Sequence, residues 1–215
     1  MRRIVRLVGV CAVAASWMVP LSAHALFSFI GVAQNLPVSS LTGWTQCYSD
    51  TYANSGTPLS TILAQCSGAQ LLLACRPTGS STLTLAANAP RADVIFDTGT
   101  GINSTHTANG VNWYFNNSWS WGFAPGGDSV QRDSCDIDFS TDSNLRMCWH
   151  TGSDTINTGY RCGDNNLNGN SRWERLIFQT SPTPAPALSS PGLIALGAAL
   201  LAVGAYVTNR HRRRV

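Results

Sequence analysis

The densest aromatic stretch of the chain reads Val111-Asn112-Trp113-Tyr114-Phe115-Asn116-Asn117-Ser118-Trp119-Ser120-Trp121-Gly122-Phe123. Aromatic residues on both sides of an Asn-Asn-Ser cluster predict two strands joined by a tight turn. The length of the turn determines which side chains share a face, because successive residues of a strand point to opposite sides. The stretch therefore predicts a β-hairpin with two registers to distinguish.

A two-residue turn at Asn116-Asn117 would place Tyr114 opposite Trp119 and make both faces of the hairpin aromatic. An exposed face would then suit stacking against sugar rings, with Tyr114, Trp119 and Trp121 as ligand-binding residues. A three-residue loop would instead pair position 115 with 119, 113 with 121 and 111 with 123. Six apolar side chains would then share one face, as a single buried face requires. We favour this register, which makes the stripe part of the core.

Five more short runs of strand-forming residues are separated mostly by Gly, Asn, Asp or Ser clusters. They are Leu71–Cys75, Thr82–Ala86, Val94–Phe96, Arg146–His150 and Arg172–Phe178. Residues 57–66 predict one short helix, with Thr57 capping the first amides, Pro58 at the first position and Gly68 as a left-handed stop. Many short strands with one helix predict an all-β fold, a β-sandwich or jelly roll.

Six cysteines lie between residues 26 and 180, namely Cys47, Cys66, Cys75, Cys135, Cys148 and Cys162. An even number in an exported chain predicts disulfides, with 15 possible pairings. Three of these cysteines precede residue 80 and three follow residue 130, so complete pairing requires a bridge between the two halves. That bridge would make residues 26–180 one disulfide-bonded domain of about 155 residues, long enough for a hydrophobic core. The sequence contains no Cys-x-x-Cys spacing, which is the pattern that would favour a zinc site.

Both ends of the chain predict targeting segments. Residues 1–25 combine a basic start, an apolar run and a final Ala23-His24-Ala25, which is typical of a signal peptide cut after Ala25 by signal peptidase. Residues 181–191 form a Pro/Ser/Thr-rich stalk, 192–209 an apolar segment suited to a single transmembrane helix, and 210–215 an arginine-rich cytoplasmic tail. We therefore expect the export machinery to be one partner of this chain.

The stalk and the segments after it also match a known class of sorting signal. Pro186, Leu188, Ser189, Gly192 and Leu193 fit the pattern, whereas Ala185, Ala187, Ser190 and Pro191 depart from it. In this respect the tail resembles the PEP-CTERM class of bacterial sorting signals, most closely its IPTL-CTERM variant. The resemblance implies an exosortase-like membrane enzyme that cuts near the motif, and delivery to the cell surface or extracellular matrix of a Gram-negative bacterium, often together with exopolysaccharide.

The formal charge of +3 belongs to the ends rather than to the domain. Seven of the 14 arginines lie in the two terminal segments, and the chain has no lysine. Residues 26–180 hold the other seven arginines and all 11 acidic residues, which gives them a net charge of −4. Nucleic acid is therefore excluded as a predicted partner, since the basic residues serve targeting.

Catalytic motifs are scarce in residues 26–180. Only two histidines are present, His106 and His150, and both Gly-x-Ser-x-Gly and His-Glu-x-x-His are missing. Asp93, Asp97 and Asp128 could contribute to a glycosidase acid pair, whose separation a sequence does not define. The sequence therefore predicts no catalytic residue, and enzymatic activity is an alternative hypothesis.

One loop has half of a calcium-binding pattern. Asp164, Asn166 and Asn168 stand at loop positions one, three and five with Gly169 at six, as in an EF-hand, and Asn170 follows. The second half of the pattern is missing, because position twelve is an arginine. The segment predicts either a weak calcium site or an Asn-rich turn without metal.

Together these features predict an exported protein of the cell surface or matrix. Its expected role is non-catalytic binding or matrix structure, with extracellular polysaccharide as the leading ligand class. The alternative is a secreted hydrolase that acts on matrix polymers. Exposed tryptophans in the hairpin would favour binding, and a cleft with paired acids near His106 or His150 would favour hydrolysis.

Overall fold

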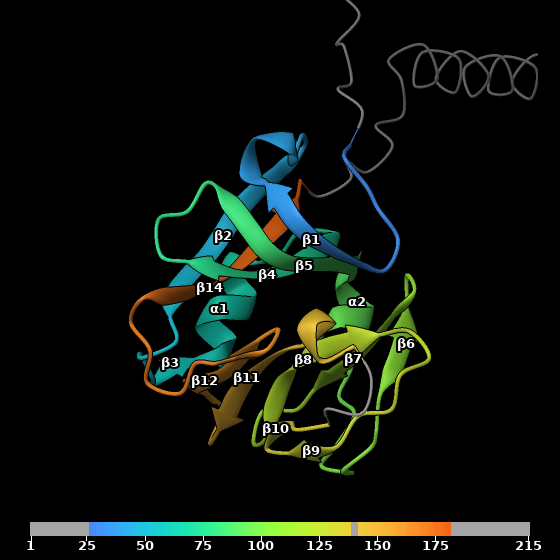
Figure 1. The fold of residues 1–215 in the computed structure, drawn as a ribbon, viewed down its shortest axis with the longest axis vertical. Coiled ribbons are helices and arrows are strands. Elements are labelled where there is room, and N and C mark those ends of the chain that lie inside the picture. The colour runs from blue at the N-terminus through green and yellow to red at the C-terminus, as the bar shows by residue number, and fades with distance from the viewer. Residues whose placement is uncertain (1–25, 139–141, 182–215) are drawn as a thin grey trace, which may run out of the picture.

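Two antiparallel sheets form the protein in the computed structural model, which describes residues 26–138 and 142–181 (Figure 1). The predicted signal peptide, the predicted sorting motif, the apolar segment 192–209 and the arginine-rich tail lie outside the described residues. Within the described residues, no helix is long and apolar enough to cross a membrane. The prediction of a mostly β fold with disulfides is confirmed.

The first sheet has five strands in the order β1-β5-β4-β14-β2, every neighbouring pair antiparallel. Their bounds are β1 Val32–Pro37, β2 Trp44–Thr51, β4 Gln70–Pro77, β5 Thr82–Pro90 and β14 Trp173–Thr180. The last strand of the chain thus lies between two early ones. This arrangement joins the two ends of the described chain within a single sheet.

The second sheet runs in the order β13-β12-β11-β8-β7-β6, and β3 also pairs with β12. Its strands are β3 Thr57–Pro58, β6 His106–Ala108, β7 Val111–Phe115, β8 Ser120–Pro125, β11 Met147–Gly152, β12 Thr155–Cys162 and β13 Asn165–Asn166. A separate two-stranded ribbon consists of β9 Arg132–Asp133 and β10 Cys135–Asp136. Two 3-10 turns lie at Val38–Ser40 and Ser143–Leu145. The α-helices are described below.

The main core is built from both sheets and from helix α1 (Leu59–Gln65). In Figure 1, α1 lies between the two layers. Trp113, Trp121 and Trp149 are completely buried here, and Trp121 meets Trp149 edge to face at 5.3 Å between ring centroids. Burial of such large side chains supplies most of the hydrophobic driving force, because each removes about 150–250 Å² from water.

Each sheet is also covered on its outer face. A second cluster, which includes Leu72 and Phe178, packs against Phe27 and Phe29 of the N-terminal segment. A third cluster forms on the far side of the β7–β8 hairpin around Tyr114 and the cystine of Cys135. Strands β4 and β7 are therefore covered on both faces, which explains their continuous rather than alternating burial.

The aromatic hairpin differs from both predicted registers. The Asn116 amide donates to the Ser120 carbonyl at 2.8 Å, so three residues form the loop, one position later than predicted. Phe115 therefore pairs with Trp121, not with Trp119. The pairing partner of each residue is shifted by two positions from the predicted three-residue loop, so each strand side chain stays on the face that was predicted for it. Val111, Trp113, Phe115, Trp121 and Phe123 all belong to the main core as predicted, while Trp119 leaves the stripe.

The predicted helix is present, but its ends differ from the expectation. Pro58 is the N-cap residue and no side chain caps the helix, so Thr57 does not have the capping role. The helix ends at Cys66, before Gly68. A Cβ on Gly68 would lie 2.2 Å from the Thr180 carbonyl oxygen, so this glycine permits close packing rather than a left-handed stop.

A second helix replaces one predicted strand. Residues 94–96 were expected to be extended, yet α2 occupies Arg91–Val94 immediately after Pro90. Arg91 explains its position, since its guanidinium donates to the carbonyl oxygens of Leu63 and Cys66. These bonds satisfy carbonyls at the end of α1 that have no partner within the helix.

All six cysteines of the domain are paired, as predicted. The bridges are Cys47–Cys66, Cys75–Cys162 and Cys135–Cys148. Cys75–Cys162 joins the two halves of the chain and links β4 of the first sheet to β12 of the second. The required bridge between the halves is therefore present.

Candidate functional site

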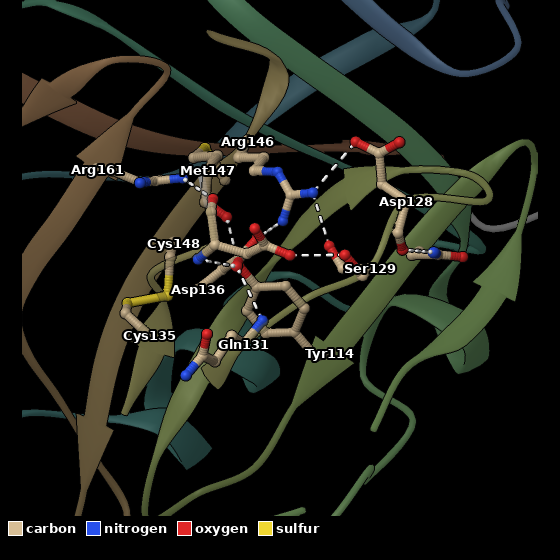
Figure 2. Close-up of polar contacts among 12 residues, drawn as sticks. Tyr114, Asp128, Ser129, Gln131, Cys135, Asp136, Arg146, Met147, Cys148 and Arg161 are labelled. Carbon is tan, nitrogen blue, oxygen red and sulfur yellow. Dashed lines mark hydrogen bonds and ion pairs between the residues drawn. A yellow bond between two sulfur atoms is a disulfide. The ribbon is translucent and has the colours of Figure 1, made fainter. Parts of the chain in front are cut away.

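The outer face of the β7–β8 hairpin, on which Asn112 and Tyr114 lie, is covered by residues 126–138 and 142–146. Figure 2 shows the polar contacts beneath this covering segment, which Cys135–Cys148 ties to β11. The Tyr114 hydroxyl donates to the Met147 carbonyl at 3.1 Å. Burial raises the pKa of Tyr114 well above its ordinary value, so it is a neutral hydrogen-bond donor here.

Arg146 and Asp136 form the centre of these contacts (Figure 2). Their side chains are completely buried and approach to 2.5 Å, and Arg146 also contacts Asp128 at 3.1 Å. Burial raises the pKa of Asp136. The contacts with Arg146 and with the backbone amides of Gln131 and Asp138 act in the opposite direction, but burial has the larger effect. With both charges enclosed and paired, this cluster holds the covering segment in place and offers no route to a ligand.

Arg132 lies beneath the tip of the hairpin. Its guanidinium carbon is 5.3 Å from the ring centroids of both Tyr114 and Trp119, and it donates to the carbonyls of Gly99 and Ser104. Trp119 is only half-buried, whereas Tyr114 and Trp121 are completely buried. Their burial corrects the expectation that all three contact a ligand, since only Trp119 is within reach of one.

A groove of about 330 Å³, which we call the β5–β6 groove, lies on the surface of the domain. Its lining residues come from five separate segments: Ser28, Gln70, Asn88, Ala89, Pro90, Asp93, Ala108 and Asn109. The end of β5, helix α2 and strand β6 meet there (Figure 1). A volume of this size reaches the lower end of the usual range for small-ligand sites.

Two asparagines form a fixed wall of the β5–β6 groove. The Asn109 amide donates to the carbonyls of Phe29 and Asn88, and the Asn88 amide also donates to Phe29. Asn109 has a left-handed backbone (φ 51°), which asparagine tolerates better than most residues. Gln70 and Ser28 make no side-chain hydrogen bond within the described residues, so they remain available to a ligand.

A histidine contacts Asp93 of the β5–β6 groove, and an aromatic residue stacks on that histidine. His106 Nε2 lies 2.7 Å from Asp93 Oδ1, and the His106 ring stacks on Phe96 at 4.4 Å between centroids. Phe96 is 51 % exposed, although it is a large apolar residue. Asp93 is the single carboxylate among the lining residues, so the groove has no acid pair of the kind that glycoside hydrolysis requires.

His150 has a different environment. Its ring stacks on that of Tyr160 at 5.7 Å between centroids. Burial lowers the pKa of His150, and the nearby charge of Arg175 lowers it further. Its imidazole is therefore neutral near pH 7. Tyr160 lines a smaller cavity of about 100 Å³ with Arg161, Asp164, Asn165 and Asn166.

The predicted calcium loop forms two consecutive turns. Asp164 accepts from the Ser143 hydroxyl at 2.5 Å, Asn166 accepts from the amide of Asn168 at 3.3 Å, and Asn170 accepts from the amide of Arg172 at 2.8 Å. The bonds of Asn166 and Asn170 are typical of Asx turns. Within residues 26–138 and 142–181, no group of three His, Cys, Asp or Glu side chains is placed to hold a metal ion. Calcium binding by this loop stays a prediction.

No protein-family model, curated protein or solved structure matches this chain. The geometry of the chain's own residues is thus the basis for its function. Sequence reasoning missed Gln70, Asn88 and Asn109, because they are far apart along the chain and meet only after folding. The one local signal was Asn109-Gly110, a typical turn pair.

Proposed function

We propose that this chain is an exported protein of the cell surface or extracellular matrix that binds polysaccharide without cleaving it. We infer further that residues 26–180 form a β-sandwich that presents the binding site. The observation that carries the proposal is the β5–β6 groove, which has carboxamides, one carboxylate and an exposed aromatic ring, Phe96, linked to that carboxylate through His106. The three disulfides support an oxidising, extracellular environment.

The groove suits a sugar for two physical reasons. A carboxamide donates and accepts hydrogen bonds, as a sugar hydroxyl does, so Gln70 can pair with hydroxyls in either sense. The C–H face of a sugar ring is apolar and packs against an exposed aromatic ring such as Phe96. These two residues are therefore the primary contacts that we propose.

Binding of the purified protein to a panel of soluble polysaccharides, measured by calorimetry, tests the proposal. We expect Gln70→Ala to weaken binding about fivefold and Phe96→Ala about tenfold, from the loss of a hydrogen bond and of aromatic contact area. Gln46→Ala on β2 and Ile102→Ala are matched controls, because both residues are exposed outside the groove. A panel without any bound polysaccharide, or two groove variants that bind like wild type, would refute the proposal.

The alternative of a secreted hydrolase rests on the contact between His106 and Asp93 beside the groove. Release of reducing ends from the same panel distinguishes the two functions. A hydrolase would release them and lose this activity in Asp93→Asn, whereas a binding protein leaves the polymer length unchanged.

The proposed destination has a separate test. Protein extracted from the cell surface should begin at Leu26 and lack the arginine-rich end, because signal peptidase and an exosortase-like enzyme would have removed the two ends. Intact mass measures both cuts. Recovery of the complete chain from residue 192 to 215 would instead favour a simple membrane anchor.

A further inference from the structure

We propose that the β5–β6 groove selects uncharged polysaccharides and rejects chains that carry uronate, sulfate or phosphate groups. This inference rests on the proposed polysaccharide-binding function and adds the chemical class of the ligand. It follows from where the structure places the positive and negative side chains of the domain.

The arginines of the domain are turned inward. Arg132, Arg146, Arg161 and Arg175 are at most 2 % exposed, although arginine is rarely buried to this extent. They make hydrogen bonds or ion pairs with interior groups, including the Asn54 and Asn157 carbonyls that Arg175 contacts at 2.6 Å. None of the four can reach an anionic ligand at the surface.

Of the three remaining arginines of the domain, one is exposed to solvent. Arg76 Nε contacts the Glu174 carboxylate at 2.7 Å. Arg91, which adjoins the groove in sequence, directs its guanidinium to the Leu63 and Cys66 carbonyls. Arg76 and Arg91 are half-buried, so Arg172 is the one exposed arginine among the described residues, and the chain has no lysine. Arginine and lysine are the side chains that most strongly pair with carboxylate, sulfate and phosphate groups.

Carboxylates, in contrast, face the solvent. Five aspartates of the described residues are exposed, namely Asp97, Asp133, Asp142, Asp154 and Asp164. Asp93 adds a carboxylate to the groove itself, and the one histidine beside it, His106, is already in contact with Asp93. Two like charges about 6 Å apart in water lower the affinity about threefold, and a polyanion repeats this penalty along its length.

The hydrogen-bonding groups of the groove favour the same ligands. Asp93 and the carbonyl oxygen of Gln70 can only accept, so they require a donor from the ligand. A sugar hydroxyl supplies that donor. A carboxylate, sulfate or ionised phosphate supplies only acceptors, so it would place a second negative group beside Asp93 without donating a hydrogen bond to it.

The test compares each uncharged glucan or mannan of a panel with its carboxymethylated derivative of equal length. We expect the uncharged polymer to bind at least about tenfold more tightly, with an affinity that is nearly constant from about 20 to 500 mM NaCl. The derivative should bind better as salt increases, because salt screens repulsion. Equal or tighter binding of the derivative, or an affinity that falls with salt, would overturn the inference.

A charge-reversing variant tests the cause. Ser28→Arg places a cation at the rim of the groove, and we expect it to raise the affinity for the carboxymethylated polymer several-fold. Ser60→Arg on α1 is the matched control, exposed but outside the groove, and should leave that affinity unchanged. An unchanged affinity in Ser28→Arg would contradict the electrostatic argument. If neither polymer class binds, the proposed function fails together with this inference, whereas preferential binding of the charged class would overturn the inference alone.

Discussion

Glu174 lies on β14, and its carboxylate accepts hydrogen bonds from three separate segments. Its partners are the Ser49 hydroxyl at 3.0 Å, Arg76 Nε at 2.7 Å and the Gly79 amide at 3.1 Å. Burial alone would raise the pKa of Glu174, but these partners outweigh burial and hold the pKa below its ordinary value of 4.5. The ionised form therefore stabilises the fold.

Because the folded pKa is lowered, this stabilisation is complete well above pH 4.5 and is lost as the pH falls through the folded value. We expect Glu174→Gln to cost about 2 kcal/mol at pH 7 and to remove much of the acid-side loss of stability. Urea denaturation between about pH 3 and 7 measures both effects. Asp133→Asn, at an exposed position, is the control. An acid-side slope that is the same in Glu174→Gln as in wild type would contradict this account.

Asp164 is the residue on which the calcium prediction depends. If the loop binds calcium like other extracellular modules, a few millimolar of the ion should raise the free energy of unfolding by about 1–2 kcal/mol. Asp164→Ala should abolish that gain and leave the metal-free stability nearly unchanged, because the position is exposed. Asp154→Ala, in a different exposed turn, is the control. A melting temperature that changes with neither calcium nor chelator would show that the segment is an Asn-rich turn without a calcium site.

At the level of elements, β2 shows why some strands escaped prediction. Its register against β14 shifts between Ile177 and Phe178, so Cys47 is an extra residue that forms a bulge. Trp44 therefore belongs to the outer cluster and Tyr48 to the main core, although an even number of positions separates them. The alternating pattern that identifies a strand in sequence is broken at this bulge.

Strand β12 was missed for a related reason, since Gly159 interrupts it. A Cβ at this position would lie 1.8 Å from a ring carbon of Tyr52. That ring is completely buried, and its hydroxyl donates to the Arg161 carbonyl and accepts from Trp149 Nε1. A glycine inside a strand thus marks the close approach of another group.

We expect Gly159→Ala to destabilise the protein by about 3 kcal/mol or more, because the bonded Tyr52 ring cannot move aside. Gly152→Ala on β11 is the matched control. Its Cβ would meet only the end of the Asn157 side chain, which can rotate away. Chemical denaturation of both variants compares the costs, and equal costs would show that Tyr52 does have room to move.

The β7–β8 hairpin shows the opposite case, in which the sequence was informative. Its apolar face was predicted correctly even though the register was not, because the faces depend only on odd or even positions. The second face could not be predicted. Its polar residues are buried by the distant covering segment, and period alone does not reveal such tertiary contacts.

For the whole molecule, the three disulfides constrain the unfolded chain to different degrees. Cys75 and Cys162 are 87 residues apart, whereas Cys135 and Cys148 are 13 apart. In the loop-entropy model, the long bridge contributes about 4–5 kcal/mol and the short one about 3 kcal/mol. We expect Cys75→Ala/Cys162→Ala to lower the unfolding free energy more than Cys135→Ala/Cys148→Ala. Urea denaturation of the two double variants measures the order, and a reversed order would contradict it.

The β5–β6 groove is a property of the whole molecule, which explains why its residues had no signature in sequence. Ser28 and Asn109 are brought together only when the N-terminal segment crosses from one sheet to the other. The amino-acid composition did predict that the surface lacks positive charge, because residues 26–180 contain fewer arginines than acidic residues and no lysine. The inward direction of the arginines required the structure.

That inward direction also governs how the protein meets other enzymes. Trypsin-like proteases need an arginine or lysine in an extended, accessible segment, and the folded domain offers only Arg172 among its described residues. Arg132, Arg146, Arg161 and Arg175 become cleavable only after unfolding. Aldehydes and activated esters, which couple to lysine, likewise find no side-chain amine to modify. The same distribution of charge makes the native domain a poor substrate for trypsin-like proteases.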